Sequence, residues 1–119
     1  METKDLSEKE FLDILSSYYS KICNQNITIK YNIRITANDN LSLSVFYEKY
    51  TSRSAHIIEL NDSDINKCFS DYADNLGYAL NHYKYIGGIN HTGYFTSENT
   101  PHFDGIRLYL KEKCKRKIR

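Results

Sequence analysis

The histidines are candidate catalytic or metal-binding residues, because imidazole changes charge near neutral pH and can bind zinc. His91 and His102 lie in one polar segment that also contains Glu98 and Asp104. The pair fits either polar loop residues that cap turns or the general acid and base of a small nuclease. A metal site is disfavoured because the chain has no H-x-x-x-H or H-E-x-x-H pattern. We expect the loop interpretation, with no catalytic residue, cofactor or metal ligand, and therefore no enzyme.

Acidic residues recur along a segment that has helical periodicity. The spacing of Asp64, Asp71 and Asp74 places the three carboxylates on one polar face. A solvated helix face is the ordinary explanation of such spacing. The alternative is an acidic docking surface for a basic partner, since complementary potentials speed association and fix its register. The residues that can extend this surface are Asp62, Asp104, Glu98 and Glu59.

Aromatic residues accompany the histidines in the glycine-rich segment 87–105. Tyr94, Phe95 and Phe103 are candidate anchors for a protein partner, because exposed loops carry many binding residues and hot spots are enriched in tyrosine. The alternative is that the rings fold back onto the core. We expect a partner-binding loop in which the carboxylate of Glu98 contacts the partner together with these rings.

The elements that position these residues follow from periodicity. Ser7 and Glu10 form a capping-box pattern, and apolar residues at steps of three and four predict a helix over about 8–23. Alternation with a period of two predicts three strands, the first from Ile27, the second over about 41–50 and the third over 55–60. A polar turn after residue 36 predicts that the first two strands form a hairpin.

The second half of the chain predicts a helix, a long loop and one more strand. Asp62 and Asp64 begin a helix over about 63–84, which the Gly87-Gly88 pair can end. Segment 87–105 is predicted as a loop, with a strand near 89–95 as the alternative, and alternation predicts a strand over 105–111. The order α-β-β-β-α-(β)-β predicts an α+β fold, a mostly antiparallel sheet of four to five strands with two helices on one face.

Charge is distributed unevenly along the chain. The net charge of the whole sequence is +1, yet the last nine residues carry six bases and one acid, which leaves residues 1–110 with a net charge of −4. We therefore expect a single domain over 1–112 and a basic tail over 113–119. Nucleic-acid-binding domains gather lysine and arginine on the folded surface. Any affinity for nucleic acid is thus expected mainly in the tail.

The length of 119 residues fits one domain. Cys23, Cys68 and Cys114 form no C-x-x-C pair, which suits a reducing compartment and argues against a disulfide scaffold or a zinc ribbon. The sequence has no apolar run of the roughly 20 residues that a spanning helix needs, and it begins without the layout of a secretory signal. We expect a cytoplasmic protein that does not enter a membrane.

Two families have a similar order of elements. Over residues 7–84 the order is similar to that of double-stranded-RNA-binding domains, whose second helix begins with a lysine-rich segment, whereas this chain has Asp62-Ser-Asp-Ile-Asn-Lys67 there. With the later strands included, the order also resembles small type III secretion chaperones, which are acidic cytoplasmic dimers that close with a further helix. The first resemblance carries no functional residue to this sequence, and the second rests on topology.

The expected function is that of a non-enzymatic protein-binding inhibitor, with an immunity protein that neutralises a cognate bacterial toxin as the favoured class. An acidic body can mimic the phosphate-rich substrate of a basic nuclease toxin. The expected partner-binding residues are Asp64, Asp71, Asp74, Tyr94, Phe95, Glu98 and Phe103. The alternatives are a phage anti-defence inhibitor, a secretion chaperone-like binding protein, a nucleic-acid-associated protein that uses the basic tail, and a small histidine-dependent nuclease.

Overall fold

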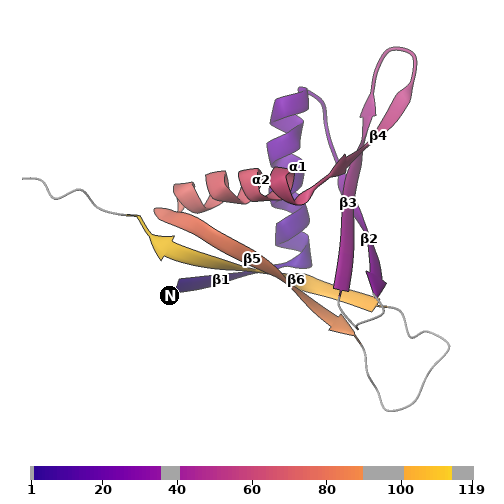
Figure 1. Cartoon of the computed structure of the whole chain (residues 1–119). Helices are drawn as coiled ribbons and strands as arrows, with labels where there is room; N and C mark the ends of the chain where they lie inside the picture. Colours follow the sequence, from indigo (N-terminus) through magenta and orange to yellow (C-terminus); the bar gives the residue numbers. More distant parts are fainter. Residues whose placement is uncertain (1, 36–40, 90–100, 114–119) are drawn as a thin grey trace, which may run out of the picture.

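The computed structural model describes residues 2–35, 41–89 and 101–113. This part of the chain forms an α+β fold with two helices and two three-stranded antiparallel sheets (Figure 1). In chain order the elements are β1 (Glu2–Ser7), α1 (Glu8–Cys23), β2 (Ile29–Ile35), β3 (Leu41–Tyr50), β4 (Ala55–Leu60), α2 (Asp62–Asn75), β5 (Tyr78–Ile89) and β6 (Pro101–Glu112).

The prediction of a single sheet is wrong, because the strands divide into two sheets with the orders β1-β6-β5 and β2-β3-β4. Alternation tells which side chains face inward, whereas it does not tell which strands pair. The last strand pairs with the first, so that the start and the end of the described chain lie side by side. Both helices lie in the angle between the two sheets, and α1 contacts β1 and β6 of one sheet and β2 of the other (Figure 1).

Helix α1 is confirmed over the predicted residues. The Ser7 hydroxyl accepts a hydrogen bond from the Glu10 amide at 3.2 Å, and the Glu10 carboxylate accepts one from the Ser7 amide at 3.1 Å. This capping box satisfies two amides that have no partner inside the helix. Asn24 ends the helix in the left-handed conformation. The helix buries Phe11, Leu15 and Tyr19.

Helix α2 ends nine residues earlier than the prediction over 63–84, and residues 78–84 belong to strand β5. Gly77 has a φ of +85°, a left-handed conformation that glycine adopts without strain, so it ends the helix at a place where apolar spacing predicts the middle of one. At the other end, Asn61 and Asp64 form a second capping box.

Strand β1 was not predicted, because only Leu6 of its six residues is buried. Its backbone pairs with β6 over the full length of the strand. The Asp5 carboxylate accepts two hydrogen bonds from the Arg107 guanidinium, at 2.7 and 3.0 Å. This contact lies on the solvent-exposed side of the sheet and joins β1 to β6.

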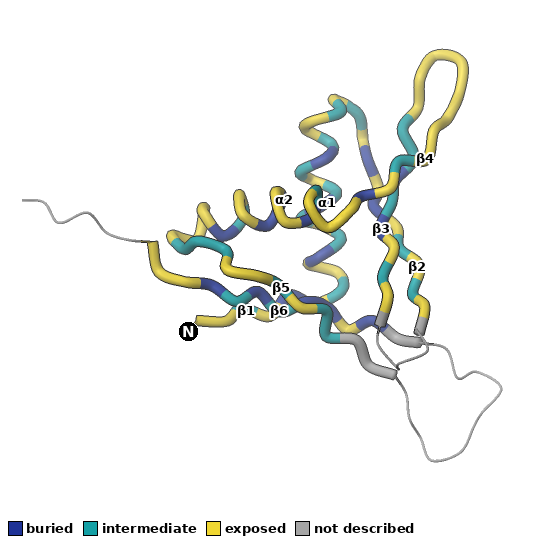
Figure 2. Tube along the Cα trace, viewed as in Figure 1, coloured by how far each residue is buried: buried dark blue, intermediate teal, exposed yellow. Residues whose placement is uncertain are grey.

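The strands β3 and β4 are confirmed over the predicted 41–50 and 55–60, and they form a hairpin that extends away from the helices (Figure 1). Every residue from Tyr50 to Ile57 is exposed, as the hairpin end in Figure 2 shows. Strand β6 begins at Pro101, four residues before the predicted start at 105. The alternative strand near 89–95 lies outside the described residues beyond Ile89.

The core is a cluster of aromatic and aliphatic side chains between the helices and the sheets. The ring of Phe11 lies 5.6 Å from that of Phe69 and 5.4 Å from that of Phe103, measured between ring centroids. Offset and edge-on ring contacts at these distances stabilise a core beyond the burial of apolar area alone. The described residues include no buried polar or charged side chain.

Candidate partner-binding site

Asp64 has a structural role in the capping box of α2. Its carboxylate accepts a hydrogen bond from the Asn61 amide at 3.0 Å, and its own amide donates one to the Asn61 side chain at 2.8 Å. The Asp64 carbonyl also accepts a hydrogen bond from the Tyr19 hydroxyl at 3.4 Å. A carboxylate in the first turn of a helix is favoured by the helix dipole. These contacts explain the position of Asp64 without a partner protein.

Asp74 forms an ion pair with Lys113, the residue that follows strand β6. Both side chains stay about half exposed, with 58% of the Asp74 side chain and 48% of the Lys113 side chain accessible to solvent. A pair of this kind contributes at most about 1 kcal/mol to stability. The pair also neutralises the acidic charge that sequence spacing assigned to a docking surface.

Because that pair is weak, we predict that the chain folds without its basic tail. A variant that ends at Glu112 loses Lys113 and the residues after it, and its melting temperature should fall by less than about 5 °C. Thermal unfolding followed by circular dichroism measures this. A larger drop would show that the tail packs on the domain, and that the boundary between 112 and 113 is misplaced.

Asp71 is exposed and stands on the rim of a groove between α1 and α2. The Tyr18 hydroxyl donates a hydrogen bond to its carboxylate, and burial together with this carboxylate raises the pKa of Tyr18 to about 12. A tyrosine held in this way remains neutral at physiological pH. Tyr18 and Asp71 line the same groove, so that the aromatic ring of one helix and the acid of the other form one surface.

The groove, which we call the helix groove, has a volume of about 330 Å³. It forms because both helices present residues at steps of three and four to each other, which aligns the two rows of side chains. Its lining residues are Ile14, Ser17, Tyr18, Lys21 and Asp13 from α1, and Cys68, Asp71, Tyr72 and Asn75 from α2. Aromatic and aliphatic groups form its floor, and charged groups form its rim.

The Cys68 thiol lies at the floor of the helix groove and is almost fully buried. Burial, with a smaller effect of the Asp71 charge, raises the pKa of Cys68 to about 12. The thiolate is the nucleophilic form of cysteine. This thiol is thus protonated at neutral pH and serves as a small apolar group in the core.

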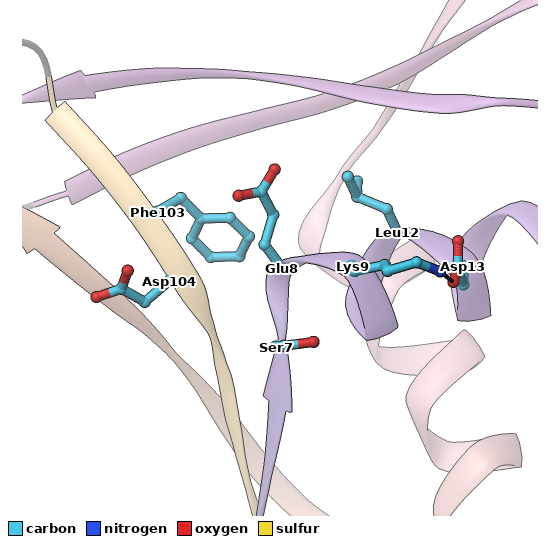
Figure 3. A pocket seen from close by; sticks show the side chains of 7 residues that line it. All are labelled: Ser7, Glu8, Lys9, Leu12, Asp13, Phe103 and Asp104. Carbon is cyan, nitrogen blue, oxygen red and sulfur yellow. Dashed lines mark hydrogen bonds and ion pairs between the residues drawn. The ribbon is translucent and has the colours of Figure 1, made fainter.

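The Phe103 side chain is fully buried against Phe11, Tyr31 and Tyr85, which agrees with the alternative that this ring folds back onto the core. The register between β5 and β6 shifts between Phe103 and Ile106, and Gly105 within this interval adopts a φ of +148°. A bulge of this kind changes which side chains of a strand face inward. Phe103 consequently points toward α1 and Asp104 points away from it (Figure 3). The other predicted loop residues, Tyr94, Phe95 and Glu98, lie outside the described residues.

A second pocket, of about 500 Å³, lies where α1 begins (Figure 3). Ser7 in this pocket is committed to the helix cap, and Lys9 pairs with Asp13 at 2.6 Å. Burial and a hydrogen bond to Glu8 raise the pKa of Tyr31 to about 12, so the Glu8 carboxylate also has a partner. The polar groups of this pocket thus support the local structure.

The histidines do not come together in the described part of the chain. His56 lies in the exposed β3–β4 hairpin, with its Nε2 atom 2.9 Å from the Ser54 hydroxyl. His82 lies in β5 and stacks on Tyr109 of β6. The backbone of His102 lies in β6, whereas its side chain and the whole of His91 lie outside the described residues. Within those limits, no group of three or more metal-ligating side chains is found.

Sequence reasoning missed the role of Tyr18 and Tyr72 in the helix groove. Both tyrosines follow the apolar spacing of their helices, which predicts a place in the core. The sequence did contain a signal for this role, because each tyrosine lies at the edge of the apolar face of its helix, next to charged residues. A tyrosine at such a boundary commonly buries its ring and keeps its hydroxyl at the surface.

No helix in the described ranges combines the length and the apolar character that crossing a membrane requires. Comparisons with models of known protein families, with curated proteins and with solved structures gave no match.

Proposed function

We propose that this chain is a non-enzymatic protein-binding inhibitor whose helix groove receives a basic segment of its partner. The favoured class is an immunity protein that neutralises a cognate bacterial toxin. The observation that carries the proposal is the position of the exposed Asp71 carboxylate beside the rings of Tyr18 and Tyr72. This arrangement places a negative charge next to the apolar faces of two aromatic rings.

Such a site fits the side chain of arginine or lysine better than it fits an acidic or a small polar group. The aliphatic stem of a basic side chain can lie against a tyrosine ring, while its charged end approaches a carboxylate. Asp71 supplies that carboxylate, because Asp13 at the far rim already pairs with Lys9 and Asp74 pairs with Lys113. We therefore assign recognition in the groove to Asp71.

A basic nuclease toxin is the partner with matching chemistry, since its substrate-binding surface is positively charged. An acidic groove placed over that surface would exclude the nucleic acid and slow its hydrolysis. A phage anti-defence inhibitor would act by the same physical means on a basic host nuclease. The two alternatives differ in the identity of the partner and share the same site.

The test is a charge reversal in the groove. We expect Asp71→Lys to weaken binding of the partner by about 10- to 100-fold, because the reversal turns an attraction into a repulsion at the carboxylate that recognises the basic side chain. The partner is first captured from a lysate of the native host and identified. The purified partner is then measured against each variant by surface plasmon resonance at two salt concentrations.

Asp74→Lys is the matched control, because it makes the same change one helical turn away at a carboxylate that is already paired. Its effect on affinity should stay below about threefold. Equal binding by wild type and Asp71→Lys would contradict the proposal. In that case the uncovered face of the β2-β3-β4 sheet, which carries Lys30, Asn32 and Arg34, becomes the site to examine.

A further inference from the structure

The β1-β6-β5 sheet has one face that no helix covers in the described chain. Its inward positions are occupied by Leu6, Leu108 and Leu110, which are buried, and Tyr83 and Tyr85 continue this side against the core. The positions between them face the opposite way. We call this second side the outer face, and its residues are Thr3, Asp5, Ala79, His82, Lys84, Arg107, Tyr109 and Lys111.

Two rings stack at the centre of the outer face. The His82 and Tyr109 rings lie 4.1 Å apart between centroids, with an angle of 14° between their planes. They are cross-strand neighbours, and the residue opposite Tyr109 on its other side is the small Thr3 of β1. His82 is exposed and lies on β5, at the edge of the sheet. The stack can therefore be extended by another flat ring.

Basic side chains surround this stack. Lys84 lies directly opposite Arg107 in the strand register, and Lys111 lies two positions beyond Tyr109. Like charges on directly opposed strand positions are destabilising. Asp5 holds the Arg107 guanidinium through two hydrogen bonds and balances one of the three bases. Asp104, which also points away from α1, is a second acid on this side of the sheet, so three bases stand against two acids. The outer face thus has a small excess of positive charge, although residues 1–110 as a whole are acidic.

We infer that the outer face binds single-stranded nucleic acid. A base would stack on the His82–Tyr109 pair, and the phosphates beside it would meet Lys84 and Lys111, since Arg107 is already paired with Asp5. Aromatic rings accept any base by its flat face, and cations along the path of the backbone supply affinity without sequence specificity. A duplex is a poorer fit because its bases are already stacked inside the helix.

This inference goes beyond the proposed inhibitor function, because the outer face points away from the helix groove. It also changes the expectation that nucleic-acid affinity lies mainly in the tail. That expectation followed from the number of bases along the chain, whereas strand pairing brings Lys84 beside Arg107 from positions far apart in the sequence.

The experiment measures fluorescence anisotropy of labelled oligouridylate and oligothymidylate of about 12 nucleotides, a length within the range of single-strand site sizes. The full chain is titrated at low salt and again at higher salt. We expect both oligonucleotides to bind and a duplex of the same length to bind more weakly. Tyr109→Ala should weaken binding about tenfold or more, because the base would have no ring to stack on.

Variants of the charged residues separate this surface from general electrostatic attraction. Lys84→Glu should weaken binding and reduce the salt slope by about 0.7 for each phosphate that Lys84 neutralises in the wild type. Lys67→Glu makes the same change at an exposed lysine on α2 and should leave affinity nearly unchanged. Tyr109→Leu keeps apolar bulk on the sheet and removes the ring, so it replaces the alanine variant if that variant fails to fold.

Three results would overturn the inference. One is the absence of binding by both oligonucleotides at low salt. Another is an equal loss of affinity in Lys84→Glu and Lys67→Glu, which would show that only net charge matters. The third comes from a full-length variant with Lys115, Arg116 and Lys117 changed to glutamate. If this variant alone loses binding and the Tyr109 and Lys84 variants keep it, the tail is the binding element.

Discussion

Phe103→Ala is expected to lower the free energy of unfolding by about 3–5 kcal/mol, the range measured for phenylalanine truncation in protein cores. Phe103 has no exposed surface, and its ring centroid lies 5.4 Å from that of Phe11 and 5.3 Å from that of Tyr31. The variant would leave a cavity where α1, β2, β5 and β6 meet. Since small domains are stable by about 5–15 kcal/mol, this loss is a large part of the total.

Urea denaturation followed by far-ultraviolet circular dichroism measures this loss. Phe46→Ala is the matched control, because Phe46 is a half-buried phenylalanine on the side of β3 that faces away from the core. The control should lose less than half as much stability as Phe103→Ala. Similar losses in the two variants, or a loss below about 1 kcal/mol at Phe103, would mean that the ring is not part of the core.

Local signals were sufficient where an element has clear ends and an uninterrupted period. The Ser7 capping box and the Asn24 end define α1, and the predicted range 8–23 is confirmed. Strands β3 and β4 alternate without a bulge between polar turns, and their predicted limits are also confirmed. In these segments local preference and tertiary packing agree, which is the condition for a reliable sequence prediction.

The error over residues 78–84 has an identifiable cause in a strand bulge. The pairing of β5 with β6 shifts between Leu80 and His82, so Asn81 is an extra residue on β5. Leu80 and Tyr83 therefore face the same side of the sheet although they are three positions apart. A spacing of three on one face is the signature of a helix. The bulge thus imitated helical periodicity and extended the predicted helix past Gly77.

The division into two sheets and the presence of β1 had no local signal. Strand β1 is short and polar, and it is held by backbone pairing to β6 about a hundred residues later in the chain, including the contact between Asp5 and Arg107. Pairing over such a separation depends on the whole fold. The outer face of this sheet could not be predicted from the sequence for the same reason.

The candidate site was predicted in part. The spacing of Asp64, Asp71 and Asp74 placed all three on α2, where the structure has them. What differs among them is their partners, since Asp64 belongs to a helix cap and Asp74 pairs with Lys113. The pairing of Asp74 with Lys113 cannot be read from spacing within α2, whereas the Asn61–Asp64 capping box is a local pattern that the sequence prediction did not use. Only the packing of α1 beside α2 brings Tyr18 to Asp71 and makes a groove there.

Gly105→Ala is expected to destabilise the β1-β6-β5 sheet, because no space exists for a side chain at this position. A Cβ atom on residue 105 would lie 2.0 Å from the Leu6 carbonyl oxygen and 3.0 Å from the Leu6 carbonyl carbon. These are backbone atoms of a paired strand, so they cannot move aside as a flexible side chain can. The φ of +148° adds strain of about 1–3 kcal/mol for a residue other than glycine.

The clash should be relieved by separation of β1 from β6 near Leu6, with loss of the hydrogen bonds between Asp5 and Arg107. Hydrogen exchange is the most direct measurement, because it should show faster exchange at the amides of β1 than at those of α2. Gly77→Ala is the matched control, since Gly77 also has a positive φ but has no atom within 4 Å of an added Cβ. Gly77→Ala introduces backbone strain without a clash, so it should lower the free energy of unfolding by about 1 kcal/mol. The pairing would be contradicted if Gly105→Ala lowered the free energy of unfolding no more than Gly77→Ala does and the amides of β1 stayed protected from exchange. In that case the backbone of β1 does not lie as close to Gly105 as the fold requires, and the strand pairing that forms the outer face is wrong.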